Sequence, residues 1–250
     1  MTVWEILGIL AAGIAAGTIN TIVGSGSLVT FPTLLAFGYP PVVANVSNSV
    51  GLVFGGVSGV IGYRRELAGQ RRRIISMAVV SALGGVSGGL LLLKLPESAF
   101  NAIVPVLILL GVVLVIVQPK LNSWMAARRS ENHDHVVAML VATFCCAIYG
   151  GYFGAAQGVI MMGVLGTLLH DHIQRLNAAK NVSTTIVNFS AAVLFVFVAD
   201  VAWIAAGLIA VGSIIGGQLG AKVGRRLPPI ALRIVIVVVG LAAVAKLLLD

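Results

Sequence analysis

The sequence predicts an all-α membrane protein made of two inverted-topology repeats, each with four long transmembrane helices and one half-length helix after a glycine-rich break. Three observations predict this fold. Of the 250 residues, 59% are hydrophobic and only 10% are charged, whereas an ordinary soluble domain carries about 25% charged residues. Apolar segments of membrane-spanning length follow one another along the whole chain, and the order of segments in the first half recurs in the second.

Eight apolar segments are long enough to cross a membrane, because a spanning helix needs about 20 residues. Two further apolar pieces, Leu28–Phe37 and Val159–Leu169, are long enough to cover only about half of the bilayer. The N-terminus lacks the basic region of a cleaved signal peptide, so we expect the first segment to stay in the membrane. The long segments are Val3–Val23, Val42–Gly62, Ile74–Leu93, Ala99–Val117, Val136–Gly154, Val182–Val198, Trp203–Ala221 and Ile230–Leu249.

No change in composition marks a soluble domain, so we expect one membrane domain over residues 1–250. Each half-length piece follows a break that contains glycine, Gly24–Ser27 in the first half and Gly154–Gly158 in the second. Each piece then leads into a helix whose start is rich in polar side chains. This order places repeat one at residues 1–119, a cytoplasmic link at 120–135 and repeat two at 136–250.

Basic links fall at different places in the two halves. Counted with its half-length piece, each half has five segments. The link Tyr63–Arg73 follows the third segment of the first half, whereas Lys222–Leu227 follows the fourth segment of the second half. Because basic links stay in the cytoplasm, the two halves must have opposite orientations, which is the pattern of inverted repeats. Both chain termini are then expected outside the cytoplasm. The net charge of +8 is thereby assigned to membrane orientation, and we expect no nucleic-acid partner.

The two breaks are the first candidate for a binding site. Backbone cannot stay unpaired in lipid, so a broken helix must face protein or a watery cavity. Paired breaks mark the binding sites of many transporters, and the N–H groups at a helix N-terminus attract anions. A second interpretation stays open, in which the glycines only let helices pack closely. The residues at the breaks are Gly24, Ser25, Gly26, Ser27, Gln157 and Gly158.

Polar side chains near the starts of two further helices are the second candidate. They are Asn45, Ser47, Asn48 and Ser49 in the first half and Asn177, Lys180, Asn181 and Ser183 in the second. A helix cap needs only one residue, so this density favours a lining of the substrate path, with caps and interhelical hydrogen bonds as the second explanation. Lys180 is either a counter-ion for an anionic substrate or a side chain that snorkels to the membrane interface.

Chemistry other than transport finds little support in the sequence. The apolar segments lack the buried acidic residues of a cation site, and no HExxH or GxSxG motif is present, so we expect no enzyme, no metal and no cofactor. The motifs His133–His135 and His170–His172 are interpreted as solvated loop residues. Cys145 and Cys146 are adjacent within an apolar run and are interpreted as reduced packing residues.

Four stretches together resemble the TauE/SafE family, also called the sulfite exporter or TSUP family. They are Ala16–Pro32, Tyr39–Asn48, Tyr149–Gly158 and Ala179–Asn181. The chain departs from the family pattern in having fewer glycines at both breaks. It also has a proline after the first break but none after the second. The resemblance covers nearly the whole chain and implies an exporter of sulfite or small organosulfonates in the bacterial inner membrane, driven by the proton gradient.

The residues themselves support a narrower expectation than the resemblance does. Paired breaks with hydrogen-bond donors and a lysine suit a small anion, and the lipid bilayer is the expected environment. A passive anion channel remains the alternative, because glycine-rich breaks can also form a selectivity filter. The oligomeric state is left open.

Overall fold

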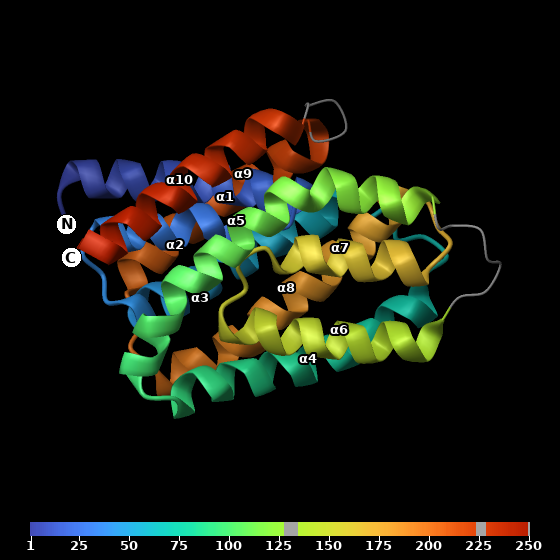
Figure 1. The fold of residues 1–250 in the computed structure, drawn as a ribbon, viewed down its shortest axis with the longest axis horizontal. Coiled ribbons are helices and arrows are strands. Elements are labelled where there is room, and N and C mark those ends of the chain that lie inside the picture. The colour runs from blue at the N-terminus through green and yellow to red at the C-terminus, as the bar shows by residue number, and fades with distance from the viewer. Residues whose placement is uncertain (128–134, 224–228, 250) are drawn as a thin grey trace.

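The computed structural model describes residues 1–127, 135–223 and 229–249. Every regular element in these ranges is a helix, and the helices lie side by side as one bundle (Figure 1). This arrangement confirms the all-α membrane fold. The helices are α1 (Val3–Ile22), α2 (Ser27–Ala36), α3 (Pro41–Gly62), α4 (Arg71–Lys94), α5 (Glu97–Ala127), α6 (Val136–Tyr152), α7 (Gln157–Leu168), α8 (Ile173–Val198), α9 (Trp203–Val223) and α10 (Pro229–Leu249).

Six helices in the described part of the chain are long and apolar enough to cross a membrane: α1, α3, α4, α5, α8 and α9. The sequence also predicts long spans at α6 and α10. α6 has 17 residues and α10 has 21, and neither is among the six helices named above. Two boundaries differ most from the predicted ones: α5 ends at Ala127 rather than at Val117, and α8 begins at Ile173 rather than at Val182. The polar stretch Asn177–Asn181 therefore lies inside the helix, where it is buried.

Each half-length helix folds back on the helix before it. Gly26 at the start of α2 packs against Ala16, and Phe37 just beyond its end packs against Gly8. In the second half, the backbone N–H of His135 donates to the carbonyl oxygen of Leu168, 3.2 Å away. The pairs α1–α2 and α6–α7 are therefore two helical hairpins, and Figure 1 shows that they enter the bundle from opposite ends.

The bundle packs through small residues, as membrane helices do. α1 runs along α9, and its counterpart α6 runs along α4, while α3 and α8 contact each other in the middle. A Cβ atom at Gly216 would overlap the carbonyl oxygen of Ile14, and one at Gly88 would overlap that of Ile148. These two glycines, which lie outside the breaks, serve close helix packing.

The two faces of α4 differ in composition, one turned toward the protein and the other away from it. Its inward face carries Met77, Leu92 and small residues, among them Ser81, Gly84 and Gly88. Its outward face is an exposed aliphatic stripe. Such a stripe is suited to lipid rather than to water. The stripe residues are Ile75, Val79, Leu83, Val86 and Leu90.

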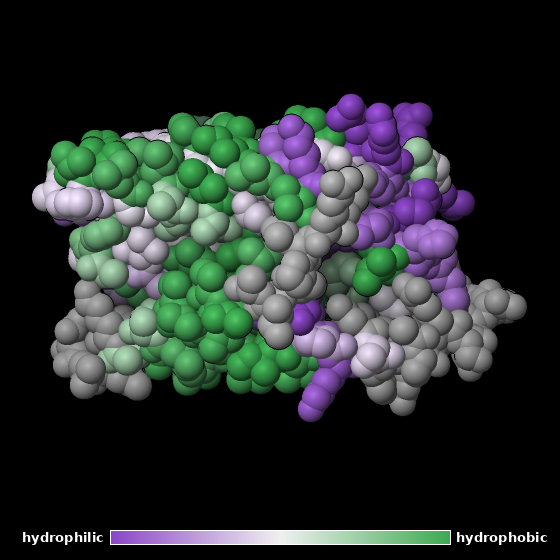
Figure 2. All heavy atoms as spheres, turned by 90° about the horizontal axis from the view of Figure 1, so that it is seen from above, coloured by the Kyte–Doolittle hydropathy of each residue, from purple (hydrophilic) through white to green (hydrophobic). Residues whose placement is uncertain are grey.

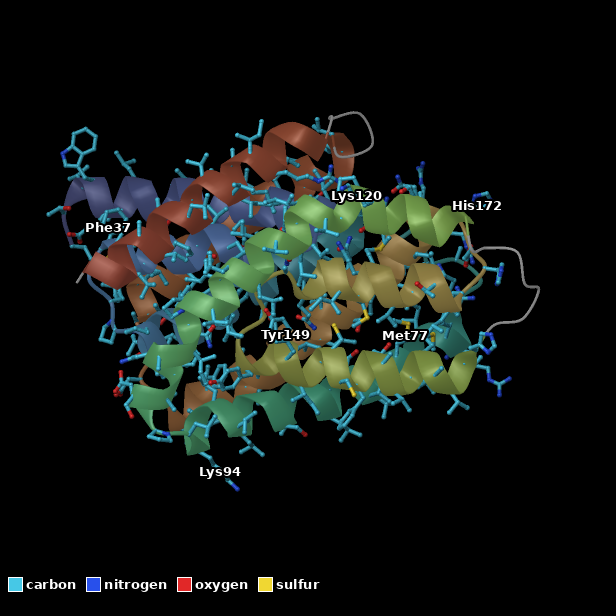
Figure 3. All side chains as sticks on the ribbon, viewed as in Figure 1. Phe37, Met77, Lys94, Lys120, Tyr149 and His172 are labelled. Atoms are coloured by element: carbon cyan, nitrogen blue, oxygen red, sulfur yellow. The ribbon has the colours of Figure 1, made fainter. Side chains whose placement is uncertain are left out.

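The two ends of the molecule differ in polarity. Both termini lie at one end, together with Phe37 and Lys94, whereas His172 lies at the other end and Lys120 lies toward it (Figures 1 and 3). The links 63–70 and 169–172 are also at this second end, where Figure 2 shows hydrophilic residues gathered on the face it presents. The predicted basic residues Arg128, Arg129, Arg225 and Arg226, and His133, lie outside the described residues.

Candidate functional site at the meeting of the two breaks

The two breaks touch each other through their backbones. The N–H of Gly158 donates to the carbonyl oxygen of Gly24 at 2.8 Å. Gly24 has a φ of 89°, a left-handed conformation that L side chains rarely adopt, and a Cβ on either glycine would overlap the backbone of the other. The tips of the two hairpins therefore meet inside the protein, where lipid does not reach the broken backbone.

The carbonyl groups at the ends of α1 and α6 find partners in the opposite half of the chain. Helix ends leave carbonyl groups without intrahelical partners. The Asn45 side-chain amide on α3 donates to the carbonyl oxygen of Tyr152 at 2.9 Å, and that of Asn177 on α8 donates to the carbonyl oxygen of Thr21 at 3.2 Å. One asparagine from each of the two predicted polar groups thus binds a carbonyl group of the opposite half.

Lys180 lies beside the end of α1 and is fully buried, with 0% of its surface exposed. Its Nζ donates to the carbonyl oxygen of Asn20 at 3.1 Å and reaches that of Thr21 at 3.5 Å. Asn181 donates to the same Thr21 oxygen at 3.3 Å. The ammonium group is thus enclosed by protein, and the ion pairs within the described ranges give it no carboxylate partner.

Several buried polar atoms around the breaks have no hydrogen-bond partner among the described residues. A buried polar group without a partner costs about 1–3 kcal/mol, so such atoms commonly mark a place that a ligand or water completes. Ser25 and Gln157 belong to the two breaks, and Asn45 and Asn177 belong to α3 and α8. The atoms are Ser25 Oγ, Gln157 Nε2, Asn45 Oδ1, Asn177 Oδ1 and the Tyr152 hydroxyl.

The structure brings some of the predicted polar residues to the first break through α2. Asn48 donates to Ser27 Oγ at 3.1 Å and accepts a short hydrogen bond from Thr30. Sequence reasoning did not include Thr30, although it follows Ser27 by one helical turn. Gly26 has an ordinary helical φ of −58°. Its close contact with Ala16 therefore reflects packing within the hairpin rather than a special backbone conformation.

Three other predicted residues make hydrogen bonds either to another segment or within their own helix. Ser47 Oγ accepts from the N–H of Ala202 at 2.9 Å, just before α9 begins. Ser49 donates to the Asn45 carbonyl of its own helix at 2.9 Å, and Ser183 shares a hydrogen bond with Ser81 on α4. For these three side chains, the structure favours the explanation by interhelical and local hydrogen bonds.

The second break carries two features that sequence reasoning missed. Ala156 has a φ of 57°, which is left-handed without being glycine. The Tyr149 hydroxyl donates to the carbonyl oxygen of Ala155 at 2.6 Å, and Figure 3 shows Tyr149 near the middle of the molecule. This hydrogen bond holds the break in shape, and the unpartnered Tyr152 hydroxyl lies one turn further along α6. Both tyrosines belong to the stretch Tyr149–Gly158, which contains the second break.

The profile of the family described as "Sulfite exporter TauE/SafE" matches residues 9–247. The chain belongs to the TauE/SafE family. It is accordingly a multi-pass membrane transporter, and the resemblance found in the four sequence stretches is confirmed. The match runs through both hairpins, both breaks and the polar starts of α3 and α8.

Curated relatives of this TauE/SafE chain carry names of the same kind. A "Probable membrane transporter protein" of Haemophilus influenzae is 28% identical over 247 residues, which cover 98% of this chain and 96% of the relative. The "Probable membrane transporter protein YfcA" of Escherichia coli K12 is 27% identical over 98% of this chain and 90% of its own. ORF9 of a Sinorhizobium species, a "Probable membrane transporter protein", is 26% identical over 97% and 92%. No solved structure matches the chain.

Proposed function

We propose that this TauE/SafE protein is a secondary carrier that exports a small sulfur oxyanion, sulfite or an organosulfonate, across the bacterial inner membrane. The observation that carries the proposal is the meeting of two breaks beside a buried lysine. Donors without partners at Ser25 and Gln157 come from the two breaks, and Lys180 brings a positive charge without a carboxylate partner among the described residues.

Electrostatics favours an anion over a cation at this place. A buried charge is costly unless it is paired, so an ammonium group held only by carbonyl oxygens is stabilised when an anion approaches. Hydroxyl and amide donors at the starts of α2 and α7 add charge-assisted hydrogen bonds, and the helix N-termini add a partial positive charge. The family description "Sulfite exporter" supports a sulfur oxyanion among the small anions.

We further propose that the two halves form an inverted repeat that moves the substrate by alternating access. α1 starts from the end with both termini, and α6 starts from the opposite end (Figure 1). The reciprocal hydrogen bonds of Asn45 and Asn177 join the two halves in the same way from both sides. Such symmetry supports a carrier in which one inverted repeat moves against the other. The proton gradient, which the family resemblance suggests, is the proposed driving force.

Counterflow tests the carrier directly. Purified protein in liposomes preloaded with sulfite should accelerate the uptake of external labelled sulfite, because a carrier returns faster with substrate bound. Uptake should saturate with concentration, and methanesulfonate should compete with it. Liposomes without the protein serve as the control. Unitary currents in a planar bilayer, without counterflow, would instead assign the protein to the channel class.

Cysteine labelling tests the proposed orientation. In a chain with Cys145 and Cys146 replaced by serine, a cysteine at position 2 should react with an impermeant thiol reagent from the periplasmic side. A cysteine in place of Gly69, in the link 63–70, should react only after the membrane is opened. This follows because the basic links belong in the cytoplasm. The reverse pattern, with Gly69→Cys labelled first, would contradict the topology.

A further inference from the structure

A second basic site lies at the end of the bundle opposite the termini, away from the breaks. A cavity of about 650 Å³ opens there between the starts of α4, α6 and α8. Three arginines line it, together with the apolar side chains of Met139, Leu140 and Leu169. The arginines are Arg72, Arg73 and Arg175. No acidic side chain is among the described residues that line the cavity.

One carboxylate holds two of these arginines together. Arg73 donates to Asp171 at 2.8 Å, and Arg175 donates to the other oxygen of Asp171 at 2.8 Å. Arg175 also donates to the carbonyl oxygen of Ala68 at 2.9 Å. This cluster joins the link 63–70 of the first half to the link 169–172 of the second. Two guanidinium groups thus bind the two oxygens of one carboxylate.

Asp171 remains a charged partner near neutral pH. Burial raises the pKa of its carboxyl group, but the hydrogen bonds from Arg73 and the His172 N–H, with the charges of Arg175 and Arg73, outweigh burial and lower that pKa below its usual value. An anion that enters the cavity therefore meets guanidinium groups whose present partner is a carboxylate, a group of similar hydrogen-bonding geometry. The two guanidinium groups thus stay paired when one oxyanion replaces another, and the displaced Asp171 carboxylate keeps the His172 N–H as a donor.

The inner wall of the cavity leads toward the breaks through flexible side chains. Met139 and Leu169 belong to an apolar cluster with Met77, Met161 and Met162. Cys146 in the same cluster donates a weak hydrogen bond to the carbonyl oxygen of Gln157, 3.6 Å away. Four of the six methionines of the chain gather here, and Figure 3 shows Met77 toward the end that carries His172. Methionine adapts its shape to irregular gaps, so this cluster is a suitable deformable barrier.

We propose that the cavity between α4, α6 and α8 is a cytoplasmic oxyanion site, in which a bound oxyanion displaces the Asp171 carboxylate from Arg73 and Arg175 and loosens the tie between the two links. The side on which it lies rests on the proposed orientation, whereas the site itself does not require the site at the breaks. The oxyanion comes either from a soluble sulfur oxyanion on its way to the breaks or from the phosphate of an anionic lipid headgroup.

Protection of an introduced cysteine tests the site. Ser76 lines the cavity, so Ser76→Cys, in the chain without Cys145 and Cys146, reports occupancy through its rate of alkylation by an iodoacetamide dye. In nanodiscs of phosphatidylcholine alone, sulfate should slow the alkylation if the oxyanion is a soluble one. In nanodiscs that contain phosphatidylglycerol, slowing without sulfate would assign the oxyanion to a lipid headgroup. Absence of slowing in both arms would overturn the proposal.

Variants identify the groups that bind the anion. Arg73→Gln or Arg175→Gln should raise the protecting concentration of sulfate or phosphatidylglycerol roughly tenfold, because each removes a charge-assisted hydrogen bond. Asp171→Asn should lower it, since the competing carboxylate is lost. Arg65→Gln is the matched control, because Arg65 lies in the link 63–70 just before α4 but does not line the cavity. An equal effect of Arg65→Gln and Arg73→Gln would reduce the site to general surface charge and overturn it.

Lys180→Gln separates this proposal from the proposed function. It should leave the protection of Ser76→Cys unchanged, because Lys180 bonds to the end of α1 and does not line the cavity. Protection that persists without counterflow would support the cavity site and contradict the carrier. If Asp171→Asn does not purify as a monodisperse protein, the comparison of Arg175→Gln with Arg65→Gln carries the same prediction.

Discussion

Gly24→Ala is expected to abolish transport and to lower the thermal stability of the purified protein markedly. The substitution acts twice at the point where the breaks meet. A left-handed conformation costs a residue with a Cβ about 1–2 kcal/mol, and Gly24 has a φ of 89°. The new Cβ would also overlap the backbone of Gly158, and overpacking of this kind typically costs about 1–3 kcal/mol. The hairpin tips must then move apart, which displaces Ser25 and Gln157.

Gly158→Ala isolates the second of these costs. Its Cβ would overlap the backbone of Gly24, but position 158 lies in the first turn of α7, where alanine is acceptable. We therefore expect a smaller loss of stability than for Gly24→Ala, with sulfite counterflow still lost. Gly207→Ala on α9 is the control, because a Cβ there meets nothing within 4 Å. Wild-type counterflow by Gly24→Ala or Gly158→Ala would mean that the breaks do not need to meet.

Lys180→Gln is expected to weaken the binding of sulfite to the purified protein by about ten- to a hundredfold, since a hydrogen bond to a charged group contributes roughly 1.5–3 kcal/mol. Lys180→Arg should restore part of the affinity, because the guanidinium keeps the charge but is larger and planar. Titration calorimetry measures both. Lys94→Gln is the matched control, as Lys94 is an exposed lysine at the opposite end of α4 from the basic links.

The same variant separates two roles of Lys180. Its hydrogen bonds to Asn20 and Thr21 also stabilise the end of α1, where a positive charge is favourable. If this were its whole contribution, Lys180→Gln would lower the melting temperature and leave the dissociation constant of sulfite unchanged. That combination would remove Lys180 from the binding site and weaken the argument for an anion.

The sequence predicted the helices well, because membrane-spanning length and apolar character are properties of each segment alone. It also placed both breaks, since glycine and a sudden end of apolar length mark them locally. The start of α8 was predicted too late. Asn177, Lys180 and Asn181 look like a polar link in sequence, but their partners are carbonyl oxygens of α1, far away along the chain. Burial of polar residues depends on partners that no local pattern contains.

By itself, the sequence determined that this protein lies in the membrane and where its helices begin and end to within about a turn in most cases. It also predicts two similar halves. It also named most of the polar residues around the breaks. Only the tertiary structure decided that Gly24 and Gly158 touch, that Asn45 and Asn177 serve each other's halves, and that Ser47 and Ser183 join helices instead. The reason is that hydrophobic length acts along one segment, whereas each of these contacts requires two segments far apart in sequence to meet.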